Sequence, residues 1–529
     1  MNMKEKHECQ KQQGPKYCIV FCLCAILLAN IIKTINCHYF DNDFFHIANT
    51  GREILKNGFF HTNVFFIEDG YEMVVQQWLY AVMLYKSYDI GGYFGVWLFT
   101  VIQIAFLGYL SYRNLRFRSV DKILAVVLSI LSLYLVPLNC RPEAISLILL
   151  LLQLICTEYY LKSRKEYVLY FLPLLTLIEN NIHSSYVIFH FVFIIPYLFS
   201  VTRIYGIKNV GLKLNTVEKD HFIFPTILML GTIPASPYGV KAVMVPFLSG
   251  NIGLIGITEM QPLTIKDDDA VVLLFIIACI CIATYRKKKL RESTLYFVLG
   301  LTFITLIAIK NEMFLYITFI LTTADLFEAV NLTKLFEILR LDKKMSFMAL
   351  MIAVIVISYI LIDGFVTVKE DGNGGYLVYN TICLKENDCE MTPVNAVRYI
   401  LDNEEDPGSV SVMTAFNNGS YFLWNGIGKV YIEPKTEPYL KTLNGKFDVI
   451  SEYYALKFAD SDFYEDFLKK YNFDYICISR NNMNALGVYL EQTDSYEKVV
   501  ESSNINKKFE KELEYVFTDY QLYRKRKEL

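Results

Sequence analysis

Two aspartates and a histidine lie close together near the start of the sequence, in the segment Asp41-Asn42-Asp43-Phe44-Phe45-His46. Asp43 and His46 are three residues apart, so on a helix their side chains share one face. A carboxylate just outside an apolar segment is suited to act as a general base if an acceptor hydroxyl comes within hydrogen-bond distance. The alternative for both aspartates is helix N-capping, because aspartate is a favoured cap residue. We prefer the cap for Asp41, with substrate binding as its other interpretation, and the general base for Asp43, with His46 as a substrate ligand.

Polar residues at the ends of apolar runs are candidate substrate ligands. The planar guanidinium of Arg141 could bind a phosphate through two hydrogen bonds, or it could extend to lipid headgroups. His183 forms a polar cluster with Asn180 and Asn181 between two apolar runs. Polar groups at membrane depth usually face a cavity, whereas the alternative here is a short solvated turn.

Three more residues are candidates for substrate binding. Lys310 ends another apolar run and is a second candidate phosphate partner. Trp78 could stack on a sugar or an isoprenoid, although tryptophan at a membrane interface is more often an anchor. Glu259 could bind a sugar or hold a divalent ion with Asp43, but a solvated loop glutamate is the commoner case. The spacing of acidic and histidine side chains places too few ligands for a metal, so no cofactor is expected.

The composition excludes a purely cytosolic globular protein. Of the 529 residues, 54% are hydrophobic and 20% are charged, and the mean hydropathy is +0.31. The apolar residues form blocks rather than an even pattern, which predicts about eleven membrane spans. These blocks cover residues 17–37, 92–112, 123–139, 143–161, 167–179, 186–202, 222–238, 270–285, 294–309, 313–330 and 346–363.

The distribution of lysine and arginine predicts the orientation of these spans. Basic residues gather in the loops that share the side of the N-terminus, and acidic residues gather in the opposite loops. By the positive-inside rule the N-terminus is cytoplasmic and the C-terminal tail is extracytoplasmic, in a multi-pass protein of the cell membrane. The first apolar run is interpreted as an uncleaved signal anchor, with a cleaved signal peptide as the alternative. The net charge of -3 gives no indication of nucleic-acid binding.

The sequence divides into a polytopic α-helical membrane domain, residues 1–363, and an extracytoplasmic α/β domain, residues 364–529. Two long outer loops are expected, at 38–91 and 239–269. The first should contain amphipathic helices over 43–57 and 74–88 that lie along the membrane surface, and Gly58 should end the earlier one. The second should lack regular structure. In the tail we expect helices from Pro393 to about 401 and over 463–471, and strands over 409–414, 429–433, 474–479 and 515–524. Cys383 and Cys389 could form a local disulfide.

The segment from Asp43 to Gly58 resembles the first outer loop of the GT-C superfamily of membrane glycosyltransferases. It is similar to that of protein O-mannosyltransferases and of the aminoarabinose transferases of lipid A, which place an aspartate before a short amphipathic helix and a glycine. Those families usually have Asp-Glu, where this chain has Phe44 in place of the glutamate. The wider chain resembles a group of uncharacterised bacterial membrane proteins, through Trp78, Arg141-Pro142, Asn181-Ile182-His183, Pro237-Tyr238-Gly239 and Gly419-Ser420-Tyr421.

The resemblance implies a GT-C-like fold and a specific activity. Such enzymes move a sugar from a polyprenyl-phosphate or polyprenyl-pyrophosphate carrier in the membrane to a glycan, lipid or protein acceptor outside the cytoplasm. Asp43 would be the base in an inverting member, and nearby cations would stabilise the leaving phosphate. Two other classes remain open: a transporter or flippase of a lipid-linked saccharide, and a non-enzymatic cell-envelope assembly protein. The near absence of charge within the apolar runs favours the enzyme over the transporter.

Overall fold

The structure is a computed structural model of the whole chain. It describes residues 18, 20–32, 34, 40–136, 140–198, 216–249, 261–264, 270–285, 291–328, 348, 351–360, 366–370, 376–380, 392–501 and 520–526.

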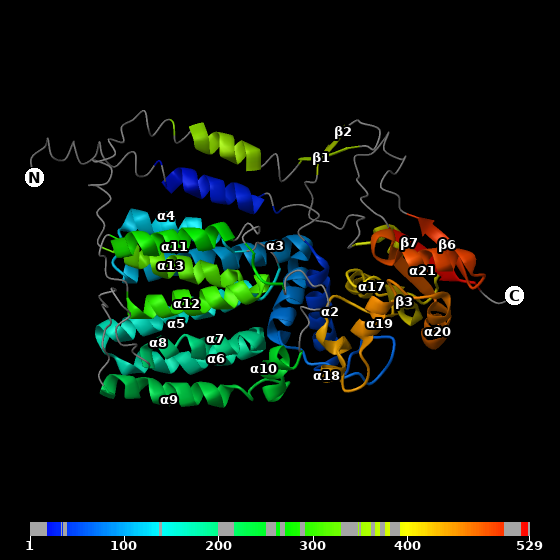
Figure 1. The fold of residues 1–529 in the computed structure, drawn as a ribbon, viewed down its shortest axis with the longest axis horizontal. Coiled ribbons are helices and arrows are strands. Elements are labelled where there is room, and N and C mark those ends of the chain that lie inside the picture. The colour runs from blue at the N-terminus through cyan, green and yellow to red at the C-terminus, as the bar shows by residue number, and fades with distance from the viewer. Residues whose placement is uncertain are drawn as a thin grey trace, which may run out of the picture.

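A bundle of helices forms the N-terminal part of the molecule, and its helices lie side by side at the left of Figure 1. Its long first member is α3 (Trp78–Phe117). The others are α4 (Lys122–Leu133), α5 (Glu143–Ser163), η1 (Glu166–Tyr170), α6 (Phe171–Ile182), η2 (Ser184–Tyr186), α7 (Val187–Val192), α8 (Ile195–Leu198), α9 (Thr216–Thr232), α10 (Gly239–Leu248), α11 (Ala270–Tyr285), α12 (Glu292–Ile307), η5 (Ile309–Asn311) and α13 (Met313–Leu326).

Two helices in the described part of the chain are long and apolar enough to cross a membrane, α3 and α5. Several shorter apolar helices accompany them, including Val20–Ile32, Met313–Leu326 and Met351–Ile360. The helical fold is confirmed, whereas the number of eleven membrane spans stays a prediction. The expected helix over 74–88 begins only at Trp78 and continues into the next apolar run as α3, through a kink at Gly91 and Gly92. Gly92 has φ 57° and ψ -151°, a conformation that glycine adopts without steric cost.

The second outer loop is not irregular throughout, because α10 occupies Gly239–Leu248. Gly239 has φ 59° and stands at the first position of this helix, so it reorients the chain there instead of preventing regular structure. The expectation for 239–269 was thus wrong at its start.

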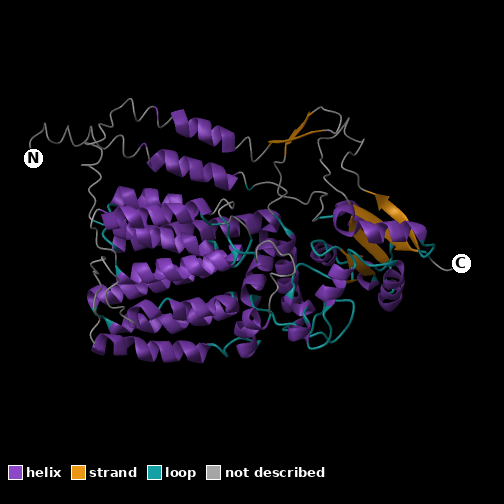
Figure 2. Cartoon of the chain, in the orientation of Figure 1, coloured by secondary structure: helices purple, strands orange, loops and turns teal. Residues whose placement is uncertain are grey.

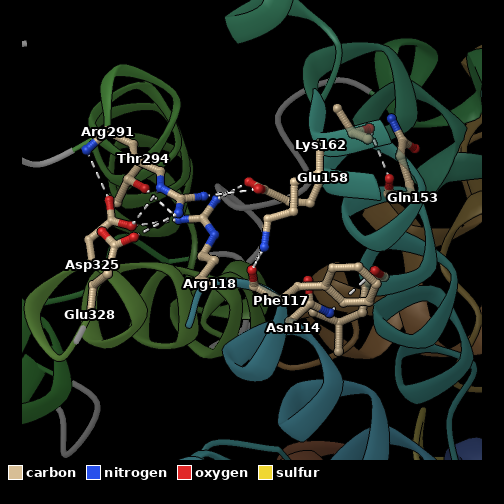
Figure 3. A network of polar contacts seen from close by, with 12 residues as sticks. Asn114, Phe117, Arg118, Gln153, Glu158, Lys162, Arg291, Thr294, Asp325 and Glu328 are labelled. Carbon is tan, nitrogen blue, oxygen red and sulfur yellow. Dashed lines mark hydrogen bonds and ion pairs between the residues drawn. The ribbon is translucent and has the colours of Figure 1, made fainter. Parts of the chain in front are cut away.

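A buried cluster of charges joins α3, α5, α12 and α13 at the C-terminal end of α3 (Figure 3). Arg118, 1% exposed, contacts Glu158 at 2.8 Å and Asp325 at 2.9 Å. Arg291 contacts the other oxygen of Glu158 at 2.9 Å, and Thr294 accepts a hydrogen bond from Arg118 at 2.8 Å. Carboxylates without such partners would be costly to bury, so this cluster fixes the four helices relative to one another.

The C-terminal part contains a sheet, whose strands are orange in Figure 2. Its five strands have the order β4-β3-β5-β7-β6. Strand β3 (Ser411–Thr414) runs parallel to β4 (Lys429–Val430) and β5 (Tyr475–Ser479), and β7 (Tyr520–Lys525) is antiparallel to β5 and β6 (Tyr496–Glu501). The helices and turns are α16 (Val394–Asn403), η6 (Pro407–Ser409), α17 (Gly419–Trp424), η7 (Glu437–Tyr439), α18 (Lys441–Asn444), α19 (Val449–Ala455), α20 (Ser461–Tyr471) and α21 (Arg480–Gln492). A separate hairpin pairs β1 (Val366–Glu370) with β2 (Tyr376–Asn380).

The α/β tail is therefore present, with helices and strands close to the expected positions. The strand expected over 429–433 is shorter, because only Lys429 and Val430 pair with β3. The possible disulfide between Cys383 and Cys389 lies outside the described residues. The boundary between two domains at residue 363 stays a prediction.

Helix α2 (Asn42–Asn57) lies between the bundle and the sheet domain (Figure 1). Asp41 caps it by accepting the Phe44 N–H at 3.0 Å, and Gly58, at φ 85°, ends it as expected. Gly51 permits close packing, because a Cβ there would overlap the backbone carbonyl of Ala81 in α3. Phe44, Phe45 and most of the first three turns are buried. The interpretation of a helix lying on a membrane surface does not account for this burial on all sides.

Candidate functional site

A cavity of about 640 Å³ opens at the junction of the bundle, α2 and the sheet domain. Six of the nine predicted site residues line it: Asp41, Asp43, His46, Arg141, His183 and Lys310. The sheet domain contributes the facing wall, through Phe416, Asn417, residues 434–437, Tyr453, Tyr454 and Lys457. Residues more than 400 positions apart in the sequence therefore surround one space.

The acidic side of the cavity is built on the start of α2. Asp43 lies in the first turn, and its Oδ2 contacts Nη2 of Arg141 at 2.6 Å. The same nitrogen contacts Oδ2 of Asp41 at 3.4 Å. Arg141 directly precedes Pro142, the N-cap residue of α5. The preferred interpretation of Asp41 as an N-cap is confirmed, since its Oδ1 accepts the Phe44 N–H.

His46 joins α2 to the sheet domain. Its Nδ1 lies 3.0 Å from Oε2 of Glu433, which is fully buried, and Ser420 donates to the same oxygen at 3.1 Å. Ser420 reaches this place because Gly419 has no side chain, and a Cβ there would overlap the carbonyl of Ile432. A carboxylate bonded to one ring nitrogen fixes the orientation of an imidazole. His46 is therefore held rigidly in the cavity wall.

The opposite side of the cavity is basic. Lys310 is exposed, and Lys435 contacts Glu437 at 3.1 Å. Burial alone would raise the pKa of Glu437, but the positive charges of Lys435 and Lys310 outweigh it and lower the pKa to about 2. Burial lowers the pKa of His183 well below its usual range, and Lys310 and Lys435 lower it further. His183 is thus neutral at physiological pH.

Nδ1 of His183 is buried and makes no hydrogen bond to the described protein atoms. The ring stacks on Tyr186, with centroids 4.1 Å apart. A buried polar atom without a partner is costly, and this one belongs to a residue that lines the cavity.

An aromatic group forms part of the facing wall. The hydroxyl oxygen of Tyr453 accepts a hydrogen bond from the backbone N–H of Phe416 at 2.9 Å. Tyr454 packs against Tyr453 with centroids 5.6 Å apart, and Lys457 lies over the Tyr454 ring at 5.0 Å. Aromatic faces beside polar groups suit a ligand that has both apolar and hydroxyl-bearing surfaces, as a sugar does.

Three predicted residues do not line the cavity or lie outside the described part of the chain. Trp78 donates its indole N–H to Oδ1 of Asn181 at 2.8 Å, so these two residues bond to each other. This bond joins α3 to α6 beside the cavity and gives Trp78 a structural partner. Glu259 lies outside the described residues. The substrate-binding roles of Trp78, Asn181 and Glu259 stay predictions.

The sequence did not mark the residues of the sheet domain that complete the site, namely Glu433, Lys435, Glu437, Tyr454 and Lys457. The segment Glu433-Pro434-Lys435-Thr436-Glu437 offered one usable signal, because it alternates charges around a proline in a tail that is otherwise regular. Nothing local indicated that this segment faces α2.

The described residues contain no group of three or more histidine, cysteine or acidic side chains arranged to hold a metal ion. A zinc site would need at least three protein ligands. Among the described residues, the donor set around Asp43 therefore has fewer ligands than a zinc site needs.

No protein-family model matches the sequence, and no curated protein is similar to it. Similar solved structures do exist. The archaeal oligosaccharyltransferase AglB from Archaeoglobus fulgidus, in complex with an inhibitory peptide and a dolichol-phosphate, is 10% identical, with a TM-score of 0.52 over 90% of this chain and 72% of that chain. The oligosaccharyltransferase of the same organism in complex with Zn and sulfate is 12% identical, with a TM-score of 0.50 over 88% of this chain and 70% of that chain.

At these identities the comparison shows the fold alone. This chain has the fold of an archaeal oligosaccharyltransferase, with a helical membrane-type domain followed by a sheet domain. The fold agrees with the coarse GT-C resemblance of the sequence. The narrower likeness to O-mannosyltransferases and aminoarabinose transferases is not supported by it.

Proposed function

We propose that this protein is a membrane glycosyltransferase that moves a sugar from a polyprenyl-phosphate-linked donor to an acceptor outside the cytoplasm. One observation carries the proposal. Asp43 and Lys310 line the same cavity, between the bundle and the sheet domain. Such a transfer needs both groups, a proton acceptor for the attacking hydroxyl and positive charge for the leaving phosphate. The shared fold with an oligosaccharyltransferase that was solved with a dolichol-phosphate supports it.

Asp43 is the proposed general base. The acceptor oxygen attacks the anomeric carbon of the sugar while the bond from that carbon to the phosphate oxygen breaks. The hydroxyl proton passes to Asp43, and the phosphate leaves with the lipid. The contact with Arg141 holds the carboxylate in a fixed direction, so little reorganisation is needed when the acceptor arrives.

The leaving phosphate is proposed to lie on the basic side, near Lys310 and Lys435. Lys310 is exposed, and Lys435 is already oriented by Glu437. Neutral His183 lines the same region of the cavity. Preorganised cations and polar groups aimed at a developing charge contribute strongly to catalysis in a site shielded from water.

Two helices of the bundle are long and apolar enough to cross a membrane, which supports a lipid-linked donor that reaches the cavity from the bilayer. We propose that the cavity and the sheet domain face the extracytoplasmic side, as the distribution of lysine and arginine predicts. The aromatic wall of Tyr453 and Tyr454 is proposed to receive the acceptor. An assay with different sugar donors, and not the geometry of the cavity, identifies the sugar.

The test is the substitution Asp43→Asn in the full chain, reconstituted in lipid and supplied with polyprenyl-phosphate-linked sugars. Removing a positioned base should slow release of polyprenyl phosphate by about 10²–10⁴-fold. Asp402→Asn is the matched control, because Asp402 is exposed on α16 and does not line the cavity. Thermal melting should show that both variants fold. A folded Asp43→Asn protein with full turnover would remove Asp43 from the mechanism.

A second measurement tests the activity in cells. Mass spectrometry should show that one envelope glycan, glycolipid or glycoprotein loses a sugar when the gene is deleted, and regains it when the wild-type gene is restored. An Asp43→Asn gene should not restore it. If the envelope is unchanged by the deletion, the glycosyltransferase proposal fails.

A further inference from the structure

Arg141 lies between the two carboxylates of the Asp41-Asn42-Asp43 segment. A single nitrogen, Nη2, contacts Oδ2 of Asp43 at 2.6 Å and Oδ2 of Asp41 at 3.4 Å. The Arg141, Asp41 and Asp43 side chains are 24%, 27% and 29% exposed, so all three are partly shielded from water. The Arg141 guanidinium therefore pairs with the carboxylates of both Asp41 and Asp43.

Both partners are held by the starts of helices and not by loose loops. Asp41 uses its Oδ1 to cap α2, which leaves Oδ2 directed to Arg141. Arg141 is followed by Pro142, whose ring fixes the backbone φ at -69° where α5 begins. The guanidinium position is consequently set by the packing of α2 and α5.

This arrangement conflicts with a divalent cation at the same carboxylates. The solved oligosaccharyltransferase with Zn and sulfate raises the question of a metal in this fold. Zinc or magnesium bound to both Oδ2 atoms would stand roughly 2.0–2.2 Å from each, in the space that Nη2 occupies. A zinc ion would also lack a third protein ligand among the described residues.

We propose that the Arg141 guanidinium is the permanent cation of this cavity and keeps divalent metal away from the Asp41 and Asp43 carboxylates. Arginine stays protonated in proteins at all physiological pH values, so its charge is always present. A metal ion would have to displace it and would meet a like charge at short range. The exclusion of metal by Arg141 does not depend on which reaction the protein catalyses. Its consequence, sugar transfer without a divalent metal at this pair, rests on the proposed function.

The internal cation also explains how an anionic donor can enter beside two carboxylates. Without Arg141, a phosphate would approach two negative charges. With it, one of those charges is neutralised, and Lys310 and Lys435 add positive charge on the other side of the cavity. The guanidinium thus performs the charge-shielding task that a metal performs in other sites.

The test measures Mn²⁺ binding to the full chain in lipid nanodiscs after EDTA treatment, by the paramagnetic resonance signal of free Mn²⁺ and by thermal melting. The wild-type protein should bind no Mn²⁺ at this pair, and its melting temperature should be the same in EDTA and in millimolar Mn²⁺. Arg141→Gln should gain a Mn²⁺ site and a Mn²⁺-dependent rise in melting temperature. The double variant Arg141→Gln with Asp43→Asn should lose both gains.

Arg398→Gln is the matched control, since Arg398 is exposed on α16 and does not line the cavity. It should behave like the wild type. If Arg141→Gln does not fold, Arg141→Met provides the same removal of charge with an unbranched apolar side chain. Mn²⁺ binding by the wild type that is lost in Asp43→Asn would overturn the proposal. So would absence of binding in both the wild type and a folded Arg141 variant, because exclusion would then not be due to Arg141.

The two proposals fail separately. If Mn²⁺ binds only the Arg141→Gln variant and no sugar transfer is found with any donor, the proposed function fails, while the proposal that Arg141 excludes metal is supported. If sugar transfer is found but requires a divalent metal that Asp43→Asn no longer binds, the glycosyltransferase stands and the internal cation fails.

Discussion

Replacing Arg118 by methionine should destabilise the helix bundle strongly. Arg118 bridges Glu158 at 2.8 Å and Asp325 at 2.9 Å, and those side chains are 3% and 0% exposed. Removing one partner of a buried ion pair costs about 3–5 kcal/mol, because it leaves an uncompensated charge. Arg291 still reaches Glu158 at 2.9 Å, so we expect the lower end of that range, about 3 kcal/mol.

The assay is equilibrium unfolding of the full chain in detergent, followed by circular dichroism. Arg113→Met is the control, because Arg113 is exposed and makes only a cation–π contact with Phe117 at 5.5 Å. It should cost about 1 kcal/mol or less.

A triple variant separates buried charge from packing. Arg118→Met combined with Glu158→Gln and Asp325→Asn removes the charges together, and it should recover part of the lost stability. The reasoning is refuted if Arg118→Met costs no more than Arg113→Met. It is also refuted if the triple variant is as unstable as a simple sum of three losses, since the penalty would then not come from an unpaired charge.

Two other changes test the packing and the charges of the site. Gly51→Ala should destabilise the protein by about 1–3 kcal/mol in thermal or denaturant unfolding, because the added methyl overlaps the α3 backbone. The control Gly300→Ala, with open space around it, should be neutral or stabilising. Equal effects of the two substitutions would contradict the close packing at Gly51. Since the pKa of Glu437 is lowered to about 2 from its ordinary 4.5, its contribution to stability is complete above pH 4.5 and is lost as the pH falls through 2. Lys435→Met should move this loss to higher pH in melting curves recorded against pH, and unchanged curves would show that Lys435 does not hold the carboxylate ionised.

Local patterns predicted the elements of this protein well. Asp41 caps α2 and Gly58 ends it, because capping depends on a few neighbouring residues. The tail strands were found near their expected positions, since alternation and turn residues are local signals. The expected loop at 239–269 was partly wrong because the glycines there were taken as breakers, whereas Gly239 turns the chain into α10.

The grouping of candidate residues was predicted only in part. Asp43, Arg141, His183 and Lys310 each stand next to an apolar run, and counting the runs places all four at the same end of the bundle. That reasoning is enough to bring them near one cavity. It does not say which of them touch, because distances of a few ångströms depend on the rotation and packing of each helix.

The sequence by itself determined an apolar helical bundle, an α/β tail and a set of polar residues gathered at one end, because hydropathy, capping and alternation are carried by neighbouring residues. Only the tertiary structure decided that Arg141 pairs with Asp43, that His46 bonds to Glu433, and that Lys435 and Tyr454 face α2. These contacts join residues about 100 to 400 positions apart. Their partners are chosen by how α2 packs between α3 and α17, and no local pattern along the chain records that choice.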